Sequence, residues 1–389
     1  MDNQTQKTEE IRPQINIALM TAERYVETHI VSSDESACRG RDYINWGPSN
    51  TFPEYLHKLY KQVVTLHAIV SQCVNYTAGD KDECKPVMND GKMNRSGETI
   101  RQIVRKAAKD YFIYGGFAFN VIRNKEGGIA EIYNVDMRYL RSNKENTVFY
   151  YSEDWTKRWG KSKDVIFPMY DRDLNWAGID DEKVKTAMAS TIAYFKGEDS
   201  DGDTYPACLY EAAIKDCEIE RMIEEFHLND LNNGFAGSYL INFVNGVPAK
   251  DVQDEINAEV NEKYGGYQNA GRIITNFAPD KDHMAIAQKL EASNFEERYK
   301  ALAARARQQI YAAFRCNPNL AGIATESLGF NNEEYESAFK LFNRTVIMPV
   351  QTMIAEALQS IYDCNLRITP FSMTGATEDD NTATGGAAA

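Results

Sequence analysis

The chain has 389 residues, 43% of them hydrophobic and 26% charged, which is an ordinary composition for a folded protein of two or three domains or one elongated subunit. Its 43 basic and 57 acidic residues give a net charge of −14, which argues against a protein that coats nucleic acid with a basic surface. Residues 1–14 lack the pattern of a signal peptide, no apolar run is long enough to span a membrane, and the seven scattered cysteines favour reduced thiols.

The N-terminal half predicts a mixed unit of helices and strands. Residues 1–14 are expected to be disordered, and Ile15–Val31 is compatible with either a strand or a short helix. Pro53 suits the first turn of a helix, and Gly79 suits the end of the next one. The remaining expected elements are an irregular segment at Arg39–Asn50, helices from Phe52, over Val63–Tyr76 and from an N-cap at Ser96 to Gly115-Gly116, and strands at Phe117–Ile122, Ile129–Val135, Met137–Arg141, Thr147–Tyr151, Val165–Pro168 and Met188–Phe195.

Three patterns in this half suggest chemistry, but each has a plainer interpretation. His67 has no second histidine at a ligand spacing, so it is interpreted as a half-buried helix residue. Asp82-Glu-Cys-Lys85 has the acid-x-Lys order of metal-dependent nucleases, yet the turns on both sides indicate an ordinary strand. The aspartates of Glu198–Asp203 have the spacing of a calcium loop, but Thr204 stands where that loop needs glycine, so a solvated linker is expected. The sequence therefore predicts no catalytic residue, no metal site and no cofactor.

Two long helices of opposite charge flank a compact unit. The first runs from Tyr205-Pro206 to about Asn233 and carries two basic and seven acidic residues. The second runs from Asn294 to about Arg315 and carries five basic and two acidic residues. This complementarity fits two helices that pack side by side, although two solvated faces would give the same pattern. The expected unit between them consists of a strand at Ser238–Val244, a helix at Asp251–Tyr264 and a strand at Gly271–Phe277.

A loop and a long helix follow the basic helix. Asn317-Pro318 should stop the basic helix, because a residue before proline avoids helical backbone angles. The loop that continues to Asn332 contains one acid and no base. The next helix, expected at Glu333–Tyr362, should be kinked at Pro349, which has no backbone N–H to donate. A strand at Leu366–Phe371 and a disordered tail at Thr374–Ala389 complete the prediction.

The order of these elements resembles the portal proteins of tailed bacteriophages with short subunits. The resemblance lies in Phe295-Glu-Glu-Arg-Tyr299, in Phe314–Gly322 and in the long helix with Pro349. It extends over most of residues 45–372, through Trp46–Asn50, the hairpin after Gly115-Gly116, and Tyr264–Gly271. It implies an α+β fold with a short or absent crown and these parts: disordered N-terminus 1–14, mixed α/β wing 15–204, stem helices 205–234 and 291–316, small α/β clip 235–290, tunnel loop 317–332, kinked wing helix with the final strand 333–373, and disordered tail 374–389.

The resemblance implies a structural role rather than an enzyme. The expected function is a dodecameric ring at one capsid vertex, through which double-stranded DNA is packaged and ejected. The implied partners are other copies of the chain, the DNA, the major capsid protein, the terminase and a head–tail adaptor. No membrane, small-molecule substrate or cofactor is implied. The implied location is the virion, and the host cytoplasm during assembly.

The resemblance also assigns roles to three groups of residues, none of them catalytic. The DNA-facing groups of the tunnel loop are uncharged, so they bind phosphate weakly and suit sliding; they are Asn317, Asn319, Thr325, Ser327, Asn331 and Asn332. Stem packing is assigned to Glu218, Glu224, Arg298, Ala303, Ala304, Arg305 and Ala306. Docking of the packaging motor on the clip is assigned to Asp251, Asp254, Glu255, Glu259 and Glu262.

Two alternative functions follow from the sequence. A different head–tail connector would serve the same particle, but such proteins are usually shorter and lack this order of helices. A metal-dependent nuclease would need a site, and the chain lacks the G-x-x-x-x-G-K-[ST], H-E-x-x-H and G-x-S-x-G motifs. The mass in solution separates the alternatives, because a portal forms a ring whereas the nuclease would be a monomer with metal-dependent cleavage.

Overall fold

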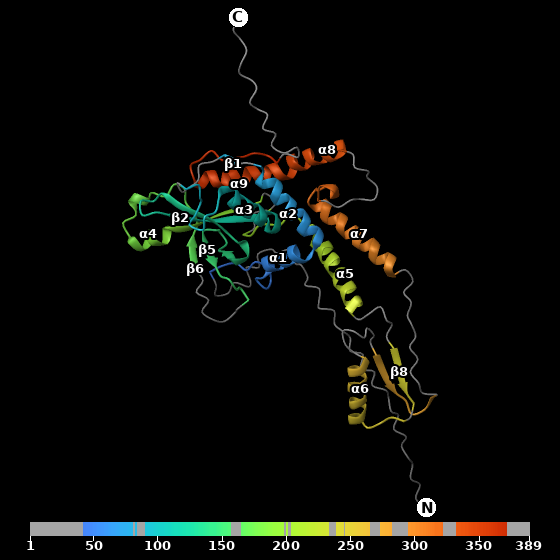
Figure 1. Ribbon diagram of the computed structural model, residues 1–389. Coiled ribbons are helices and arrows are strands. Elements are labelled where there is room, and N and C mark those ends of the chain that lie inside the picture. The colour runs from blue at the N-terminus through green and yellow to red at the C-terminus, as the bar shows by residue number, and fades with distance from the viewer. Residues whose placement is uncertain are drawn as a thin grey trace, which may run out of the picture.

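The computed structural model describes residues 42–80, 82–83, 90–156, 165–197, 200, 204–232, 239–244, 246–264, 273–281, 295–321 and 332–371. The expectations for residues 1–41, for the aspartates before Thr204 and for the tail 374–389 lie outside these ranges. Figure 1 shows a body of helices and sheets, two helices that extend from it side by side, and a smaller unit beyond them. The two extending helices are α5 (Ile214–Asn232) and α7 (Phe295–Ala313), and the smaller unit contains β8 (Tyr239–Phe243), α6 (Lys250–Tyr264) and β9 (Ile273–Phe277).

The body begins with a segment at 42–50 without helix or strand, as expected, and three helices follow it, with the short strand β1 (Asp82–Glu83) between the second and the third. Pro53 lies in the first turn of the first helix, where its missing N–H removes no hydrogen bond. The second helix ends at Gly79, whose φ of 61° lies in the left-handed region that favours glycine. The helices are α1 (Phe52–Gln62), α2 (Val64–Ala78) and α3 (Ile100–Tyr114).

The N-cap of α3 is Thr99, and the prediction of Ser96 was wrong. The Thr99 hydroxyl accepts a hydrogen bond from the backbone N–H of Gln102, and the Gln102 side chain accepts one from the backbone N–H of Thr99. This reciprocal capping box satisfies two N–H groups that would otherwise have no helical partner, whereas Ser96 would cap only one. At the other end, a Cβ on Gly115 would lie 1.8 Å from the carbonyl oxygen of Ala207, so glycine is needed where α3 turns into the sheet.

Two three-stranded antiparallel sheets complete the body. In the first, β2 lies between β3 and β7, and in the second, β5 lies between β4 and β6. A bridge between Met169 and Ile192 connects the second sheet to the first. The strands are β2 (Gly116–Arg123), β3 (Ile129–Val135), β4 (Leu140–Ser142), β5 (Val148–Tyr151), β6 (Val165–Pro168) and β7 (Ser190–Lys196).

Two of the predicted strands differ from those in the structure. The segment Met137–Arg141 contains a 3-10 turn at Met137–Tyr139 before β4, because the Asp136 carboxylate accepts a hydrogen bond at the start of that turn. The strand predicted at Met188–Phe195 is β7 in the structure and begins at Ser190, two residues later than predicted. Met188 instead ends a helix, α4 (Glu182–Met188), that the sequence did not indicate.

A single hydrophobic core joins the helices to the first sheet. Helix α3 packs against β2 and α2, and α9 (Met348–Ile361) packs against α2 and α3. Burial of each large apolar side chain in such a core contributes about 1.5–3 kcal/mol. Fully buried examples are Leu66, Ile103, Phe112, Phe119 and Ile354.

The long C-terminal helix is interrupted by a π-helical turn at Asn343–Ile347, between α8 (Asn332–Phe342) and α9. We expected one helix kinked at Pro349, and the structure places the interruption just before that residue. The proline ring has no N–H to donate to the carbonyl of Thr345 and crowds it, and the wider π turn relieves this conflict. The chain then pairs β10 (Arg367–Ile368) with β1 (Asp82–Glu83).

Helix α5 starts later than predicted. Residues 205–210 are not helical, and a 3-10 turn at Glu211–Ala213 leads into Ile214. Tyr205 is held in the body instead, where its ring stacks on Trp46 at 4.4 Å and its hydroxyl donates a hydrogen bond to the carbonyl of Ile44. These contacts with Ile44 and Trp46 hold Tyr205 away from the axis of α5, so the helix does not extend back to it.

Candidate assembly site

The helices α5 and α7 pack side by side, as their opposite charges suggested. Ala306 and Ile310 are fully buried on α7, and Ile223 is buried on α5. Farther along the pair, the rings of Phe226 and Tyr299 stack with their centroids 5.3 Å apart. The contact is therefore an apolar seam that runs along both helices.

One arginine connects the two helices electrostatically. Arg307 lies 3.8 Å from Glu220 and 3.7 Å from Glu224. Glu220 is buried and accepts a hydrogen bond from the Thr65 hydroxyl on α2 at 2.9 Å. Burial raises the pKa of Glu220, an effect that Thr65 and Arg307 oppose. The ion pairs thus link α7 to α5, and the hydrogen bond from Thr65 links α5 to α2.

The residues predicted for stem packing occupy different environments within one subunit. Ala306 is buried, whereas Ala304 and Arg305 are exposed. Ala303 is half-buried, and the side chain of Arg298 lies outside the described residues. Of the acids, Glu224 pairs with Arg307 across the seam, and Glu218 pairs with Arg221 on its own helix at 2.8 Å.

Several large apolar side chains of these helices remain exposed. Met222, Phe226 and Leu228 on α5 are 52%, 42% and 58% exposed, and Leu302 on α7 is 38% exposed. Exposed apolar side chains on neighbouring helices indicate an interaction surface, here one that surrounds the helix pair, because Leu228 faces a different side of α5 from Phe226. We call these four residues the stem patch.

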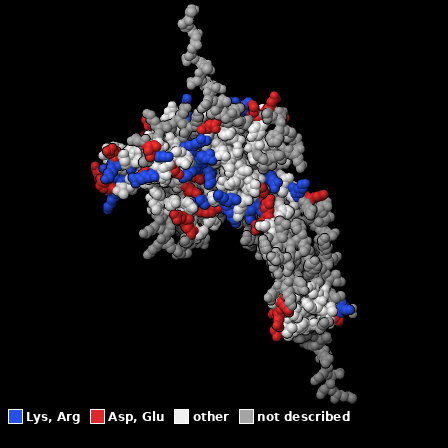
Figure 2. Space-filling model, viewed as in Figure 1, with Lys and Arg blue, Asp and Glu red and all other residues white. Residues whose placement is uncertain are grey.

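The smaller unit is a β-α-β arrangement. Strands β8 and β9 are parallel, the rings of Phe243 and Phe277 stack at 5.1 Å, and Asn276 donates a side-chain hydrogen bond to Asn242. Figure 2 shows acidic side chains gathered on one side of this unit. Of the predicted docking acids, the exposed ones are Asp251, Asp254, Glu255 and Glu259, and the side chain of Glu262 lies outside the described residues.

The start of the predicted tunnel loop packs against the body. Residues Pro318–Ala321 form a 3-10 turn that contacts α2 and α8, and Leu320 is buried there. Asn317 is half-buried and accepts a hydrogen bond from the backbone N–H of Asn319 at 3.0 Å. The predicted DNA-facing residues Thr325, Ser327 and Asn331 lie outside the described residues, as does the side chain of Asn332 at the start of α8.

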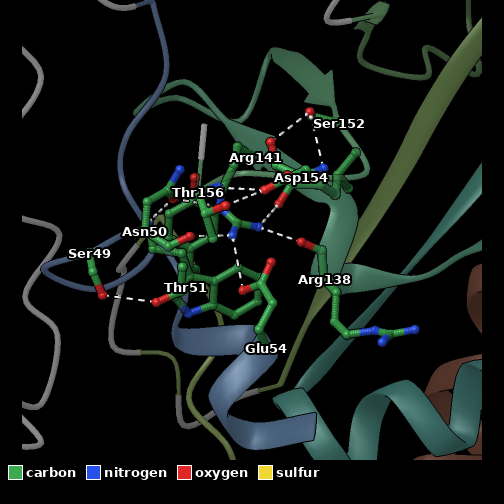
Figure 3. A network of polar contacts seen from close by, with 12 residues as sticks. Ser49, Asn50, Thr51, Glu54, Arg138, Arg141, Ser152, Asp154 and Thr156 are labelled. Carbon is green, nitrogen blue, oxygen red and sulfur yellow. Dashed lines mark hydrogen bonds and ion pairs between the residues drawn. The ribbon is translucent and has the colours of Figure 1, made fainter. Parts of the chain in front are cut away.

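A buried polar cluster holds the second sheet to α1, and no sequence pattern predicted it. The Arg141 side chain on β4 is completely buried between the indole rings of Trp46 and Trp155. Figure 3 shows its guanidinium between Asn50, Glu54 and the backbone at Arg138. Two hydrogen bonds run to Asn50, at 2.6 Å to the side-chain oxygen and at 2.7 Å to the carbonyl, and Glu54 lies 3.5 Å away.

Burial of this cluster disfavours the charged forms of both Arg141 and Glu54. Burial lowers the pKa of Arg141, and it raises the pKa of Glu54 despite the nearby guanidinium. Asn50 adopts a φ of 59°, a left-handed conformation that asparagine tolerates, and its side-chain oxygen also accepts the backbone N–H of Trp46. Asn50 therefore fixes the path of the chain just before α1.

The remaining sequence patterns concern His67, a possible metal site and a possible membrane span. His67 is exposed rather than half-buried, and its ring stacks on Tyr60 at 4.7 Å. Among the described residues, no group of three or more His, Cys, Asp or Glu side chains could hold a metal ion. Within the same ranges no helix is long and apolar enough to cross a membrane.

Known proteins resemble this chain in structure but not detectably in sequence. No protein-family model and no curated protein matches the sequence. A chain of the virion of a native gene transfer agent (GTA) particle is 17% identical with a TM-score of 0.54, over 84% of both chains. A chain of the neck of a native GTA particle, computed with C12 symmetry, is 16% identical with a TM-score of 0.52, again over 84% of both.

A crystal structure of an HK97-family phage portal protein from Corynebacterium diphtheriae is 14% identical with a TM-score of 0.49, over 81% of this chain and 94% of that one. The first two similarities establish the fold. The α+β fold that the sequence predicts is confirmed, and the chain shares its fold with a protein chain of the GTA particle.

Proposed function

We propose that this chain is the portal subunit of a tailed phage or phage-like particle, and that twelve copies form a ring at one capsid vertex. The observation that carries the proposal is the fold shared, over 84% of the chain, with a chain of a particle neck computed with C12 symmetry. The stem patch supports the proposal, because Met222 and Leu228 are exposed in one subunit and do not belong to its hydrophobic core, so contact with a neighbouring subunit would bury them.

In this ring, double-stranded DNA passes through the central channel during packaging and ejection. The exposed acids of α6 support a docking role for the smaller unit, since they offer a charged surface to the terminase or a head–tail adaptor. We assign the predicted tunnel loop after Ala321 to the channel wall, since Pro318–Ala321 packs against the body, and the sheets of the body to the contact with the major capsid protein. The chain acts as a conduit rather than an enzyme, in the virion and, during assembly, in the host cytoplasm.

Electron microscopy of the purified full-length chain tests the ring. We expect annular particles in negative stain and a mass of many subunits by mass photometry. A chain that stays monomeric at micromolar concentration would exclude the portal function.

A variant pair tests the stem patch separately. Met222→Ser should reduce the fraction of rings, because it removes apolar surface from α5 without disturbing the buried seam. Val184→Ser is the matched control, since Val184 is similarly exposed on α4. If both variants assemble like the wild type, the rings form through another surface.

A further inference from the structure

A stripe of basic side chains crosses the body on α1 and α3, away from the stem patch. It consists of Lys61 on α1 and of Arg101, Arg105 and Lys109 on α3, all of them exposed or half-buried. We call these four residues the basic stripe. Figure 2 shows Lys and Arg side chains gathered over the positions that α3 and α1 occupy in Figure 1.

The basic side chains form a continuous row, because three of them share one face of α3 and the Tyr60 ring joins the last of these to Lys61 on α1. Arg101, Arg105 and Lys109 are four residues apart, so they lie on one face of α3 and span about 12 Å. The ammonium groups of Lys109 and Lys61 lie 5.5 Å and 5.6 Å from the centre of the Tyr60 ring. Tyr60 thus connects the end of the row on α3 to α1.

Neutral groups, rather than carboxylates, hold the two guanidinium groups in place. Arg101 donates hydrogen bonds to the backbone carbonyls of Gly79 and Asp80, and Arg105 donates one to the side-chain oxygen of Asn75 at 2.7 Å. A carbonyl or amide oxygen orients a guanidinium but leaves its positive charge uncompensated. Each group also keeps further N–H donors for a ligand.

The carboxylates of this region are occupied elsewhere or lie at its margin. Asp110, the one acid of α3, is buried and accepts a hydrogen bond from Asn134 at 2.7 Å. Glu98 pairs with Lys106, which projects beside the row. Asp80 is half-buried next to Arg101 at the end of the stripe. The stripe is therefore a positive surface on a chain whose net charge is −14.

We propose that the basic stripe binds phosphate groups of double-stranded DNA, at a site separate from the α5–α7 stem. Successive phosphates of one strand are farther apart than the 3.4 Å rise along the duplex axis, and their spacing is close to the ~6 Å between neighbouring residues of the row on α3, so each of the four cations can contact one phosphate. Oriented guanidinium groups and lysine point charges are the side chains that contact phosphate best. An acidic face of another copy would be the competing ligand. The acids of α5 already pair with Arg221 and Arg307, whereas the exposed acids of α6 remain a candidate that the assembly readout below tests.

This contact does not require a ring, so it can be tested independently of the proposed function. Fluorescence anisotropy of a short labelled duplex, titrated with the full-length chain at several salt concentrations, measures the number of phosphate contacts. Four contacts predict a slope of about −3.6 for log K against log salt, and about a 150-fold loss of affinity between 50 and 200 mM salt. Arg105→Gln/Lys109→Gln should reduce the slope to about −1.8 and the loss to about 12-fold.

The control variant carries the same change of charge at the far end of the body. Arg172→Gln/Lys183→Gln removes two exposed cations at and near α4, and it should keep the wild-type slope. The proposal is wrong if the wild type does not bind at 50 mM salt, or if both double variants change the slope equally. It is also wrong if the stripe variant loses rings while its slope stays unchanged, because the stripe would then be a contact between copies.

Discussion

Two neighbouring alanines on α7 separate packing within the subunit from packing between subunits. Ala306 is fully buried on the side of α7 that packs against the rest of the chain, whereas Ala304 is exposed. Leucine adds three carbon atoms at either position. At Ala306 we expect overpacking to lower the free energy of unfolding by about 1–3 kcal/mol. At Ala304 an isolated subunit should change by less than about 0.5 kcal/mol, as exposed positions do.

Thermal unfolding and mass photometry together measure both effects. A loss of 1 kcal/mol lowers Tm by about 2–4 °C in domains of 150–250 residues, so Ala306→Leu should unfold measurably earlier. Ala304→Leu should unfold like the wild type but fail to form rings, because the added side chain blocks a close approach by the next subunit. Ala304→Ser keeps the side chain small and should assemble normally. Normal rings from Ala304→Leu would refute the close packing at this face, and an unchanged Tm of Ala306→Leu would refute its burial.

Three further variants test other parts of the chain. Asn50→Ala removes the side-chain oxygen that accepts a hydrogen bond from the buried guanidinium of Arg141 and leaves only the backbone carbonyl of residue 50. This should lower the free energy of unfolding, measured in urea, by about 3 kcal/mol. Asn50→Asp keeps a side-chain acceptor and should lower it less. Burial, aided by nearby cations, lowers the pKa of His57 from 6.5 to about 4, so its contribution to stability is present above pH 6.5 and is lost as the pH falls toward 4. His57→Gln should flatten Tm against pH in that window, and an unchanged slope would contradict this. Thr325→Arg/Ser327→Arg should leave rings intact but slow or stall packaging, because each arginine adds a phosphate contact that must be broken as the DNA moves. It should also increase the salt dependence of DNA retention. Unchanged packaging by such rings would refute the assignment of this loop to the channel wall.

Periodic patterns predicted most of the helices and strands. The spacing of apolar residues placed α7 and put Ala306 and Ile310 on its buried side, where the structure has them. The sequence failed where a distant contact overrides a local preference. Tyr205 belongs by pattern to the start of α5, but its hydroxyl bonds to Ile44, 161 positions away.

The charged residues show the same limit. Net charge was compatible with packing of α5 against α7 but left two solvated faces open, and it could not tell that Arg307 would make the pairs while Arg305 faces outward. Arg141 gave no signal at all, because an arginine in a short strand normally faces solvent. Its burial depends on Asn50 and two indole rings that only the folded chain brings together.

The π turn at Asn343–Ile347 has a consequence for how this chain is aligned with its relatives. A π turn holds one residue more than the α-helical turn it replaces. A relative without it would carry one residue fewer at this point, and each position of an α-helix rotates the helix by about 100°. An ungapped alignment would therefore match Phe339, which packs edge-to-face on Tyr76, with a residue on a different side of the relative's helix. A single-residue gap inside 343–347 restores the match, and it should be the first one tried when distant homologues are compared by sequence.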